Sequence, residues 1–405
     1  MSLRDLVGLA LLLLALLVAV PAGVLLLQLV AALMKRPAPG EASMAAPRDD
    51  MLAVLMPAHD EAAGIAAAIA AVRAQLGPRD RLLVVADNCS DATAAIARAA
   101  GAEVSERSDA QRRGKGYALD HGVRWLENVR CDPPGVVVIV DADCIVAPHA
   151  LDRLAQRCLS SGRPVQALYL MHAPPGAPLR LRIAEFAWIV KNKVRPLGAA
   201  ALGGPCQLMG TGMAFPWALI RSAPLASGHL VEDMQLGLDL AAAGTAPLFC
   251  PQALVSSVFP NDVAGARAQR TRWEHGHLSV IARTGPRLLL RALARRDTAS
   301  AALALDLMVP PLAALVLALG TLLAIDLAWW RLAADAWPAA VAAAALALLA
   351  AGVLATWRRE ARHLVTGREL LGLPLYVAAK IPVYVRLFTK RQVEWVRTKR
   401  DDHSH

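Results

Sequence analysis

Between residues 136 and 143 the sequence reads Val-Val-Val-Ile-Val-Asp-Ala-Asp, a continuous apolar run that ends in two aspartates. A short run rich in β-branched residues predicts a strand that is buried on both faces, as in parallel sheets. Asp141 and Asp143 then lie at the carboxyl end of this strand, and their hard oxygens suit Mg²⁺ or Mn²⁺. Aspartate is also common in turns, so a simple turn is the alternative.

Two earlier segments follow the same plan. Apolar runs at 51–56 and 81–86 end in the polar clusters 57–61 and 87–91, and helical patterns occupy 61–76 and 90–100. This alternation predicts an α/β fold with a mainly parallel sheet, whose ligands bind beyond the carboxyl ends of the strands. Three carboxylate clusters would meet there and repel one another unless cations or hydrogen-bond donors neutralise them. A divalent metal together with a nucleotide would do so.

The composition indicates that part of the chain lies in lipid. Hydrophobic residues make up 56% of the 405 residues and charged residues 19%, against roughly 45–50% and 25% in ordinary globular domains. The runs 6–34, 303–328 and 339–357 are each long enough to cross a bilayer, which takes about 20 residues. The first run is too long for a secretory signal, and Lys35 with Arg36 after it places the next segment in the cytoplasm.

These features predict five segments. Residues 1–36 form an N-terminal transmembrane anchor, 37–50 a linker, 51–296 the catalytic domain, 297–358 a transmembrane helical hairpin and 359–405 an interfacial amphipathic tail. Trp329, Trp330 and Trp337 are expected in the loop of the hairpin, at the membrane interface. A fourth span at 370–388 is the alternative to an interfacial helix, because Lys380 and two prolines interrupt that run.

The charge and the cysteines narrow the class of protein. The net charge is +10, but the densest basic stretches flank the apolar runs, which favours membrane lipid over nucleic acid as the partner. The six cysteines form no CxxC pair, so they are expected to be reduced thiols in a cytoplasmic domain. An integral protein of a plasma membrane, with its catalytic domain in the cytoplasm, fits both observations.

Three further motifs carry candidate chemistry. Lys115 lies in the sequence Arg-Arg-Gly-Lys-Gly at 112–116. Its glycines allow close approach of a phosphate and its cations can bind one, although a solvent-exposed loop without such a role is an equally good interpretation. Asp233 follows Glu232 at a predicted helix start, where it can act as a general base or simply cap the helix. Residues 269–273 read Gln-Arg-Thr-Arg-Trp, in which an arginine can hold a diphosphate and an indole can stack on a sugar. A basic helix face on lipid headgroups is the alternative for that last motif.

Taken in order, these motifs resemble family 2 glycosyltransferases of the membrane-anchored QxxRW branch, which includes the cellulose and hyaluronan synthases. The resemblance covers residues 50–285. The sequences at 86–91, 112–120 and 210–217 are most similar to those of bacterial exopolysaccharide glycosyltransferases. It implies a GT-A fold, which is Rossmann-like, and a hexosyltransferase activity that takes a sugar from a nucleotide-sugar donor, with UDP as the expected nucleotide.

The resemblance also implies roles for individual residues. Asp233 would be the catalytic base, and Asp143 with Asp141 would bind the metal. Donor binding falls to Pro57, Glu61, Asp87, Lys115, Asp141 and Arg272, and acceptor binding to Gln269, Trp273, Trp217 and Glu232. The expected reaction is a single inverting displacement onto a lipid-linked or saccharide acceptor at a bacterial inner membrane.

Three other functions compete with the predicted transfer of single sugars. A processive polysaccharide synthase is the alternative enzyme; it needs a channel built from many helices, which three predicted spans supply only if the protein assembles into a larger complex. A non-catalytic nucleotide-binding scaffold would have lost the aspartate pair or the base, and both are present. A transporter would carry more spans and more charges at mid-membrane depth.

Overall fold

The structure, a computed structural model, describes residues 2–35, 50–129, 132–226, 231–260 and 263–389, with the backbone alone for 263–272 and 386–389. Its internal contacts divide the chain into two compact units. The apolar-helix unit comprises Met1–Lys35, Pro175–Gly204 and Glu274–Gln392, and the sheet unit comprises Arg36–Pro174, Pro205–Trp273 and Val393–His405. Each unit has its own core.

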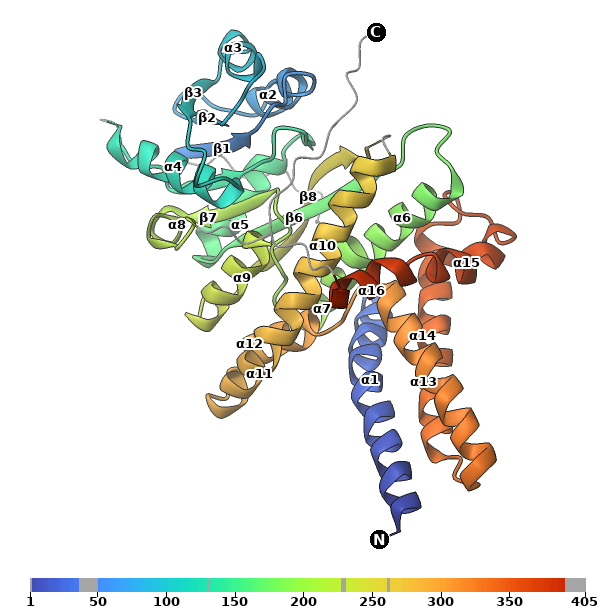
Figure 1. Cartoon of the computed structure of the whole chain (residues 1–405). Coiled ribbons are helices and arrows are strands. Elements are labelled where there is room, and N and C mark those ends of the chain that lie inside the picture. Colours follow the sequence, from blue (N-terminus) through green and yellow to red (C-terminus); the bar gives the residue numbers. More distant parts are fainter. Residues whose placement is uncertain (1, 36–49, 130–131, 227–230, 261–262, 390–405) are drawn as a thin grey trace. The chain divides into compact units, whose positions relative to one another are not determined.

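The sheet unit is built on one eight-stranded sheet, shown in Figure 1. Its strands are β1 (Leu52–Ala58), β2 (Arg81–Asp87), β3 (Glu103–Arg107), β4 (Val136–Ile139), β5 (Ile145–Val146), β6 (Val165–His172), β7 (Met213–Pro216) and β8 (Leu248–Val258). They are ordered β3-β2-β1-β4-β7-β6-β8-β5. The first four are mutually parallel, β6 is parallel to β8, and β7 and β5 run antiparallel to their neighbours. The predicted α/β fold with a mainly parallel sheet is confirmed.

Helices cover both faces of this sheet. They are α2 (Ile65–Arg73), α3 (Thr93–Ala99), α4 (Lys115–Asn128), α5 (Ala150–Ser161), α8 (Trp217–Ser222) and α9 (Glu232–Ala242). Side chains of α4, α8 and α9 share one core with alternate residues of β1, β2, β4 and β7, and α5 packs against β4, β6, β7 and β8. Gly122 lets α4 approach the sheet closely, because a Cβ there would lie 2.3 Å from Leu55 Cδ1.

Strand β1 extends past the end predicted for it. Pro57 was expected to terminate the strand, yet β1 continues through it to Ala58. On the side of β4 the pairing ends at Leu55, opposite Ile139, and on the side of β2 Pro57 is paired with Val85. A proline that lies beyond the last residue of one ladder loses no hydrogen bond on that side, so the strand tolerates it.

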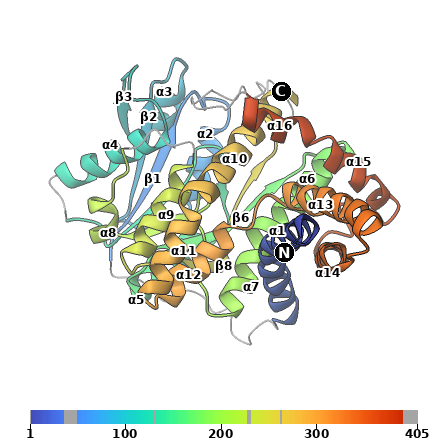
Figure 2. The same cartoon turned by 60° about the horizontal axis from the view of Figure 1, so that its bottom comes forward.

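The apolar-helix unit contains three helices that are long and apolar enough to span a membrane, among the residues described. They are α1 (Leu3–Met34), α13 (Leu312–Ala333) and α14 (Trp337–Glu360), and they lie side by side in Figures 1 and 2. The remaining elements are α6 (Leu179–Ile189), the π-helical turn η1 (Val190–Val194), α7 (Arg195–Ala201), α11 (Gly285–Ala294), α12 (Thr298–Leu307), η2 (Glu369–Gly372), α15 (Leu373–Ala378) and α16 (Ile381–Thr389).

Two details of the predicted spans differ from the structure. The run at 303–328 is divided, because Pro310 and Pro311 separate α12 from α13. Trp329 and Trp330 therefore lie inside α13 instead of in the loop, and Trp337 begins α14. The stretch 370–388 forms short helices, which agrees with an interfacial segment more than with a fourth span.

Residues 175–204 pack with the apolar helices, although the predicted boundaries include them in the catalytic domain. Gly198 on α7 lies against α1, since a Cβ on it would meet the Gln28 carbonyl at 1.9 Å. Arg195 then donates to the Asp306 carboxylate at 2.9 Å, and Gln28 donates to the same carboxylate at 2.7 Å. Buried hydrogen bonds between segments distant in the chain thus place α7 in this unit. The predicted linker falls almost wholly outside the described residues.

Candidate active site

The polar residues that follow the parallel strands lie together at one edge of the sheet. The His59 ring, after β1, hydrogen-bonds through Nδ1 to the Asp87 carbonyl at the end of β2, with 2.7 Å between the atoms. A carbonyl only accepts, so Nδ1 carries the proton. Asp60 accepts from the backbone N–H of Ser90 at 2.6 Å and of Asp91 at 3.2 Å. These bonds tie the first two strand-end loops to each other.

Three of the residues predicted to bind the donor lie at this edge. Pro57 is half-buried at the end of β1, and the Glu61 N–H donates to Thr93 Oγ1 at 2.8 Å. Asp87 is 5% exposed and accepts from Arg107 Nη1 at 2.6 Å. The Arg107 guanidinium in turn lies 5.7 Å from the centre of the Tyr117 ring. The carboxylate of Asp87 is therefore held in place by β3 and α4.

A second cluster forms around Lys115, the first residue of α4. Its ammonium pairs with the Asp141 carboxylate and donates to the Gly210 carbonyl at 2.8 Å. A Cβ added to Gly210 would meet Asp233 Oδ2 at 3.4 Å and Lys115 Nζ at 3.7 Å. Asp233 and Glu232 both act electrostatically on Lys115. The structure thus brings together four residues from a stretch in which the first and last are 118 positions apart: Lys115, Asp141, Glu232 and Asp233.

Burial and mutual repulsion shift the pKa values of this cluster. Burial raises the pKa of Asp141, although Lys115 opposes the effect, and Asp143 and Asp233 add to it. Burial, followed by the charge of Asp233, raises the pKa of Glu232 to about 7. Burial alone would lower the pKa of Lys115, but Asp141 and Glu232 outweigh it, and the net shift is upward. Acidic groups outnumber the ammonium here, so the cluster favours an added cation.

Asp143 completes a group of possible metal ligands. Ligand atoms of Asp141, Asp143 and Cys144 lie within 4.8 Å of one another. Cys144 Sγ donates to Asp143 Oδ1 at 3.2 Å, and burial with the neighbouring charge of Asp143 holds the pKa of its thiol well above the ordinary value. Because the protonated thiol is a poor ligand, two hard carboxylates remain, which fits Mg²⁺ or Mn²⁺ and not a thiophilic metal.

A second acidic group, Asp60 with Cys89 and Asp91, has similar spacing but a different use. Asp60 accepts two backbone N–H groups, as described above, and Asp91 accepts from the N–H of Ala62 at 3.1 Å and of Thr93 at 2.9 Å. These carboxylates stabilise turns. Asp141 and Asp143 are therefore the better metal site.

The loop 209–212 positions the cluster, whereas the sequence suggested for the stretch 203–217 either a loop that meets the acceptor or a buried turn under the sheet. Thr211 is 0% exposed, and its Oγ1 accepts the backbone N–H of Asp141 at 3.0 Å. Gln166, buried on β6, donates to the Thr211 carbonyl at 2.9 Å and accepts from the Met209 N–H at 2.8 Å. Glycines with positive φ at 210 and 212 flank the threonine. The Gly-Thr-Gly pattern was the available clue.

The structure speaks against one predicted acceptor contact, that of Trp217. Strand β7 runs antiparallel to β4, with Pro216 opposite Val136, and the Trp217 N–H donates to the Gly135 carbonyl at 3.1 Å. Trp217 therefore lies at the amino end of β4, whereas Asp141 follows its carboxyl end. Its side chain is partly buried and packs against the core shared by β1, β4 and α4, which favours a structural role.

The QxxRW motif lies on α10 (Val263–Arg283). The side chains of Gln269 and Arg272 fall outside the described residues, so their predicted contacts stay predictions. Trp273 is described and half-buried.

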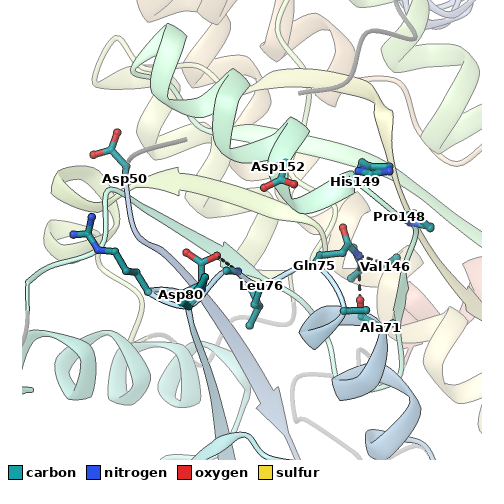
Figure 3. A pocket seen from close by; sticks show the side chains of 13 residues that line it. Asp50, Ala71, Gln75, Leu76, Asp80, Val146, Pro148, His149 and Asp152 are labelled. Atoms are coloured by element: carbon teal, nitrogen blue, oxygen red, sulfur yellow. Dashed lines mark hydrogen bonds between the residues drawn. The ribbon is translucent and has the colours of Figure 1, made fainter. Parts of the chain in front are cut away.

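A groove of about 800 Å³ in the sheet unit lies away from these residues. Figure 3 shows its walls, which include Asp80 before β2 and His149 with Asp152 at the start of α5. Asp80 Oδ1 accepts the N–H of Leu52, the first residue of β1, at 2.9 Å. The groove is thus at the amino ends of the parallel strands, opposite the carboxylate cluster.

Comparisons with known proteins agree with this fold. Residues 47–276, more than half of the chain, match the family model described as glycosyltransferase like family 2. No curated protein gives a significant match. A mannosyltransferase from Pyrobaculum calidifontis, solved in complex with GDP-Man and Mn²⁺, is 19% identical and has a TM-score of 0.54, with 94% of this chain and 100% of that chain covered.

Glucosyl-3-phosphoglycerate synthase from Mycobacterium tuberculosis, solved with Mn²⁺, UDP and phosphoglyceric acid, is 24% identical over 60% of this chain and 84% of that chain, with a TM-score of 0.40. At these identities the solved structures bear on the fold alone, which the first of them shares. The family match and the fold together assign this chain to the family 2 glycosyltransferases with a GT-A fold.

Proposed function

We propose that this glycosyltransferase is a metal-dependent, inverting enzyme of a bacterial inner membrane, with its sheet unit in the cytoplasm. It transfers a sugar from a UDP-sugar to a lipid-linked or saccharide acceptor in the synthesis of an exopolysaccharide or cell-surface glycan. The observation that carries the proposal is the convergence of Lys115, Asp141 and Asp233 beside Asp143 at the carboxyl edge of the sheet. The described part of the chain has three helices that are long and apolar enough to span a membrane, and we therefore propose the addition of single sugars, with polymer synthesis as the alternative.

Donor binding uses the two clusters of this edge. Pro57, Glu61 and Asp87 border the space for the nucleoside, and Lys115 contributes a positive charge toward the phosphates. Asp141 and Asp143 would hold Mg²⁺ or Mn²⁺, which when bound neutralises charge on the diphosphate. Gln269, Arg272 and Trp273 complete the proposed site from α10, with Arg272 on the diphosphate and the other two toward the acceptor.

Asp233 acts as the general base in this proposal, with Glu232 beside it binding the acceptor. Asp233 takes the proton of the acceptor hydroxyl as the hydroxyl oxygen forms a bond to the anomeric carbon. The bond from that carbon to the diphosphate oxygen breaks on the opposite face, and the nucleoside diphosphate leaves with the bonding electrons. Lys115 and Arg272 stabilise the charge on the leaving group. One displacement inverts the anomeric configuration, so an α-linked donor gives a β-linked product.

Release of nucleoside diphosphate by membranes that contain the protein tests the proposal. A panel of UDP-, GDP- and other nucleotide sugars is offered with and without Mn²⁺, and native lipid extract supplies acceptors. Metal-dependent release with one donor is expected, and Asp143→Ala and Asp233→Asn should abolish it. Asp152→Asn, an equivalent change at the opposite edge of the sheet, is the matched control and should retain turnover.

Full turnover in Asp233→Asn would refute the role of Asp233 as the base. Release of nucleoside diphosphate at the same rate with and without Mn²⁺ would refute the metal site. No release from any donor would refute the catalytic function and favour a nucleotide-binding scaffold. Release of GDP alone would correct the nucleotide and leave the reaction in place.

A further inference from the structure

Asp109, two residues beyond the edge strand β3, has no part in the predicted site, yet it is the centre of a hydrogen-bond network in the sheet unit. Its Oδ1 accepts the backbone N–H of Gln111 at 3.0 Å and of Arg112 at 2.9 Å. Its Oδ2 accepts from Arg107 Nη2 at 3.1 Å. The N–H of Arg112 contributes most to lowering the pKa of Asp109 below its ordinary value, so the carboxylate is charged at neutral pH. One oxygen therefore holds the chain that follows, and the other pairs with β3.

Arg107 connects Asp109 to the nucleoside end of the proposed donor site. The same guanidinium donates through Nη1 to Asp87 at 2.6 Å, and the Arg107 side chain is 12% exposed. Asn88 makes a second connection, because its Nδ2 donates to Asp87 Oδ1 at 2.9 Å and its Oδ1 accepts the N–H of Asp109 at 2.8 Å. A guanidinium presents several donors in a fixed plane and can bind two carboxylates at once. Two bridges thus join the Asp87 carboxylate to Asp109.

In the other direction, Asp109 leads to the phosphate end of the proposed donor site. Residues 110–114 connect it to Lys115, the first residue of α4. Gly114 has a φ of +126°, and a Cβ built on it would meet nothing within 4 Å, so packing does not fix the chain at this point. The hydrogen bonds from Asp109 to the N–H groups of 111 and 112 hold the chain just before this glycine.

A carboxylate that closes a turn is common, and a partly exposed ion pair contributes little to stability. Asp109 differs from such a residue in where its two sets of partners lead. Arg107 acts on Asp87, which is predicted to bind the donor, and the turn at 111–112 leads to Lys115. The nucleoside and the diphosphate belong to one ligand, so the spacing of their two subsites must match it. A displacement of about 1 Å in such a site can cost a hundredfold.

We infer that Arg107 and Asp109 are positioning residues of the donor site, which fix the spacing between its nucleoside end at Asp87 and its phosphate end at Lys115. All four residues belong to the sheet unit. The inference rests on the proposed function of Asp87 and Lys115 in donor binding.

The test compares nucleoside and nucleotide binding by the full-length protein in nanodiscs with Mn²⁺. UDP is titrated by calorimetry and uridine by ligand-observed NMR, with GDP and guanosine in parallel. Asp109→Ala should weaken UDP binding by about tenfold, because charge-assisted hydrogen bonds no longer hold the turn. Uridine binding should stay within about twofold, because Arg107 and Asn88 still hold Asp87. Asp109→Asn keeps an acceptor for the two N–H groups and should lose less.

Arg107→Met leaves the Asp87 carboxylate with Asn88 alone, so it should weaken the binding of both uridine and UDP. Arg107→Lys serves if that variant fails to fold, because it keeps a charge beside Asp87 but cannot reach both carboxylates. It should weaken UDP more than uridine. In turnover, Asp109→Ala should raise KM for the donor and leave kcat within about threefold, since Asp233 and the metal carboxylates lie on other elements.

Asp80→Ala is the matched control. Asp80 also closes a turn, in which it accepts the Gly77 N–H at 2.7 Å and the Leu52 N–H at 2.9 Å, but it lies at the amino ends of the strands. This variant should lose stability and keep the wild-type ratio of UDP to uridine affinity. Wild-type UDP affinity in Asp109→Ala, equal losses for uridine and UDP in that variant, or the same selective loss in Asp80→Ala would overturn the inference.

Amide hydrogen exchange of residues 108–118 supplies a readout that does not depend on a ligand. Asp109→Ala should exchange faster there and Asp80→Ala should not. Wild-type exchange in Asp109→Ala would overturn the inference. If the wild-type protein binds none of the four ligands, the proposed function fails and the donor-site role of both residues fails with it, whereas faster exchange in the variant would still show that Asp109 holds the turn.

Discussion

Thr211→Val tests whether the neutral loop behind the aspartates is needed to place them. Thr211 is 0% exposed, and its Oγ1 accepts the Asp141 N–H at 3.0 Å. Valine has nearly the same shape, so the change creates no cavity and removes only the hydroxyl, which accepts the Asp141 N–H and also interacts with the Cys144 thiol. A buried donor left without a partner costs about 1–3 kcal/mol.

That cost must appear in one of two measurements. If the end of β4 relaxes so that the Asp141 N–H reaches water, the carboxylates move and Mn²⁺ binding weakens. With about 1.4 kcal/mol for each factor of ten, the loss lies between about 5- and 150-fold. If the loop cannot relax, the same free energy is lost from stability and the thermal midpoint falls. Thr211→Ser keeps the hydroxyl and is the control.

The assay combines two measurements on the purified protein in nanodiscs. Mn²⁺ affinity is measured by electron paramagnetic resonance of free Mn²⁺, and unfolding by differential scanning calorimetry. Wild-type values for Thr211→Val in both measurements would refute the role of this hydrogen bond. Equal losses in Thr211→Ser, which keeps the hydroxyl and lacks the methyl group, would attribute the effect to packing of the loop instead of the missing acceptor.

Three further outcomes are expected. Gly212→Ala should lower stability by about 2–5 kcal/mol, because φ is +65° and the new Cβ would meet Ala167 Cβ at 2.7 Å. The calorimetric control is Gly64→Ala, where an added Cβ meets nothing within 4 Å. The pKa of Glu232 is raised from 4.5 to about 7, so its contribution to folding stability is complete below pH 4.5 and is lost as the pH rises through about 7. Deprotonation of Glu232 adds a negative charge near Asp141, and the affinity of the protein for Mn²⁺ should therefore rise by up to about tenfold from pH 6 to 8. Glu232→Gln should flatten that dependence, and a wild-type profile in the variant would contradict the assignment. Trp217→Ala should lower stability by up to about 3–5 kcal/mol while kcat per folded molecule stays constant, and a selective loss of acceptor affinity would restore the acceptor role that the fold argues against.

The parallel half of the sheet could be predicted because its strands are buried on both faces. β1, β2 and β4 read as unbroken apolar runs, and the polar clusters after them fall where a parallel sheet collects its ligands. The antiparallel strand β7 gave no such guidance. Only its pairing with β4 shows that the chain leaves it at the opposite edge, a position that the sequence could not indicate for Trp217.

The three long apolar helices α1, α13 and α14 could be predicted from length and hydropathy, since each is long and apolar enough to span a membrane. Residues 175–204 could not be assigned in this way, because Lys191, Lys193 and Arg195 give them the look of a soluble segment. Their place depends on hydrogen bonds from Arg195 to Asp306 and on the contact of Gly198 with Gln28. Those partners are more than 100 residues away, and local composition does not encode them.

The candidate site shows the same division between chemistry and placement. Asp141, Asp143, Lys115 and Asp233 could be singled out from the sequence because the proposed reaction needs a metal, a cation and a base, and few residue types supply them. Thr211 and Gln166 escaped because they act through backbone N–H and carbonyl groups, which every residue possesses. A charged side chain in such a site is useful only at one position, and neutral, buried hydrogen bonds are what hold it there. We therefore expect substitutions at Thr211 and Gln166 to change metal affinity and stability without altering the charge of the site, whereas substitutions at the aspartates change both charge and chemistry.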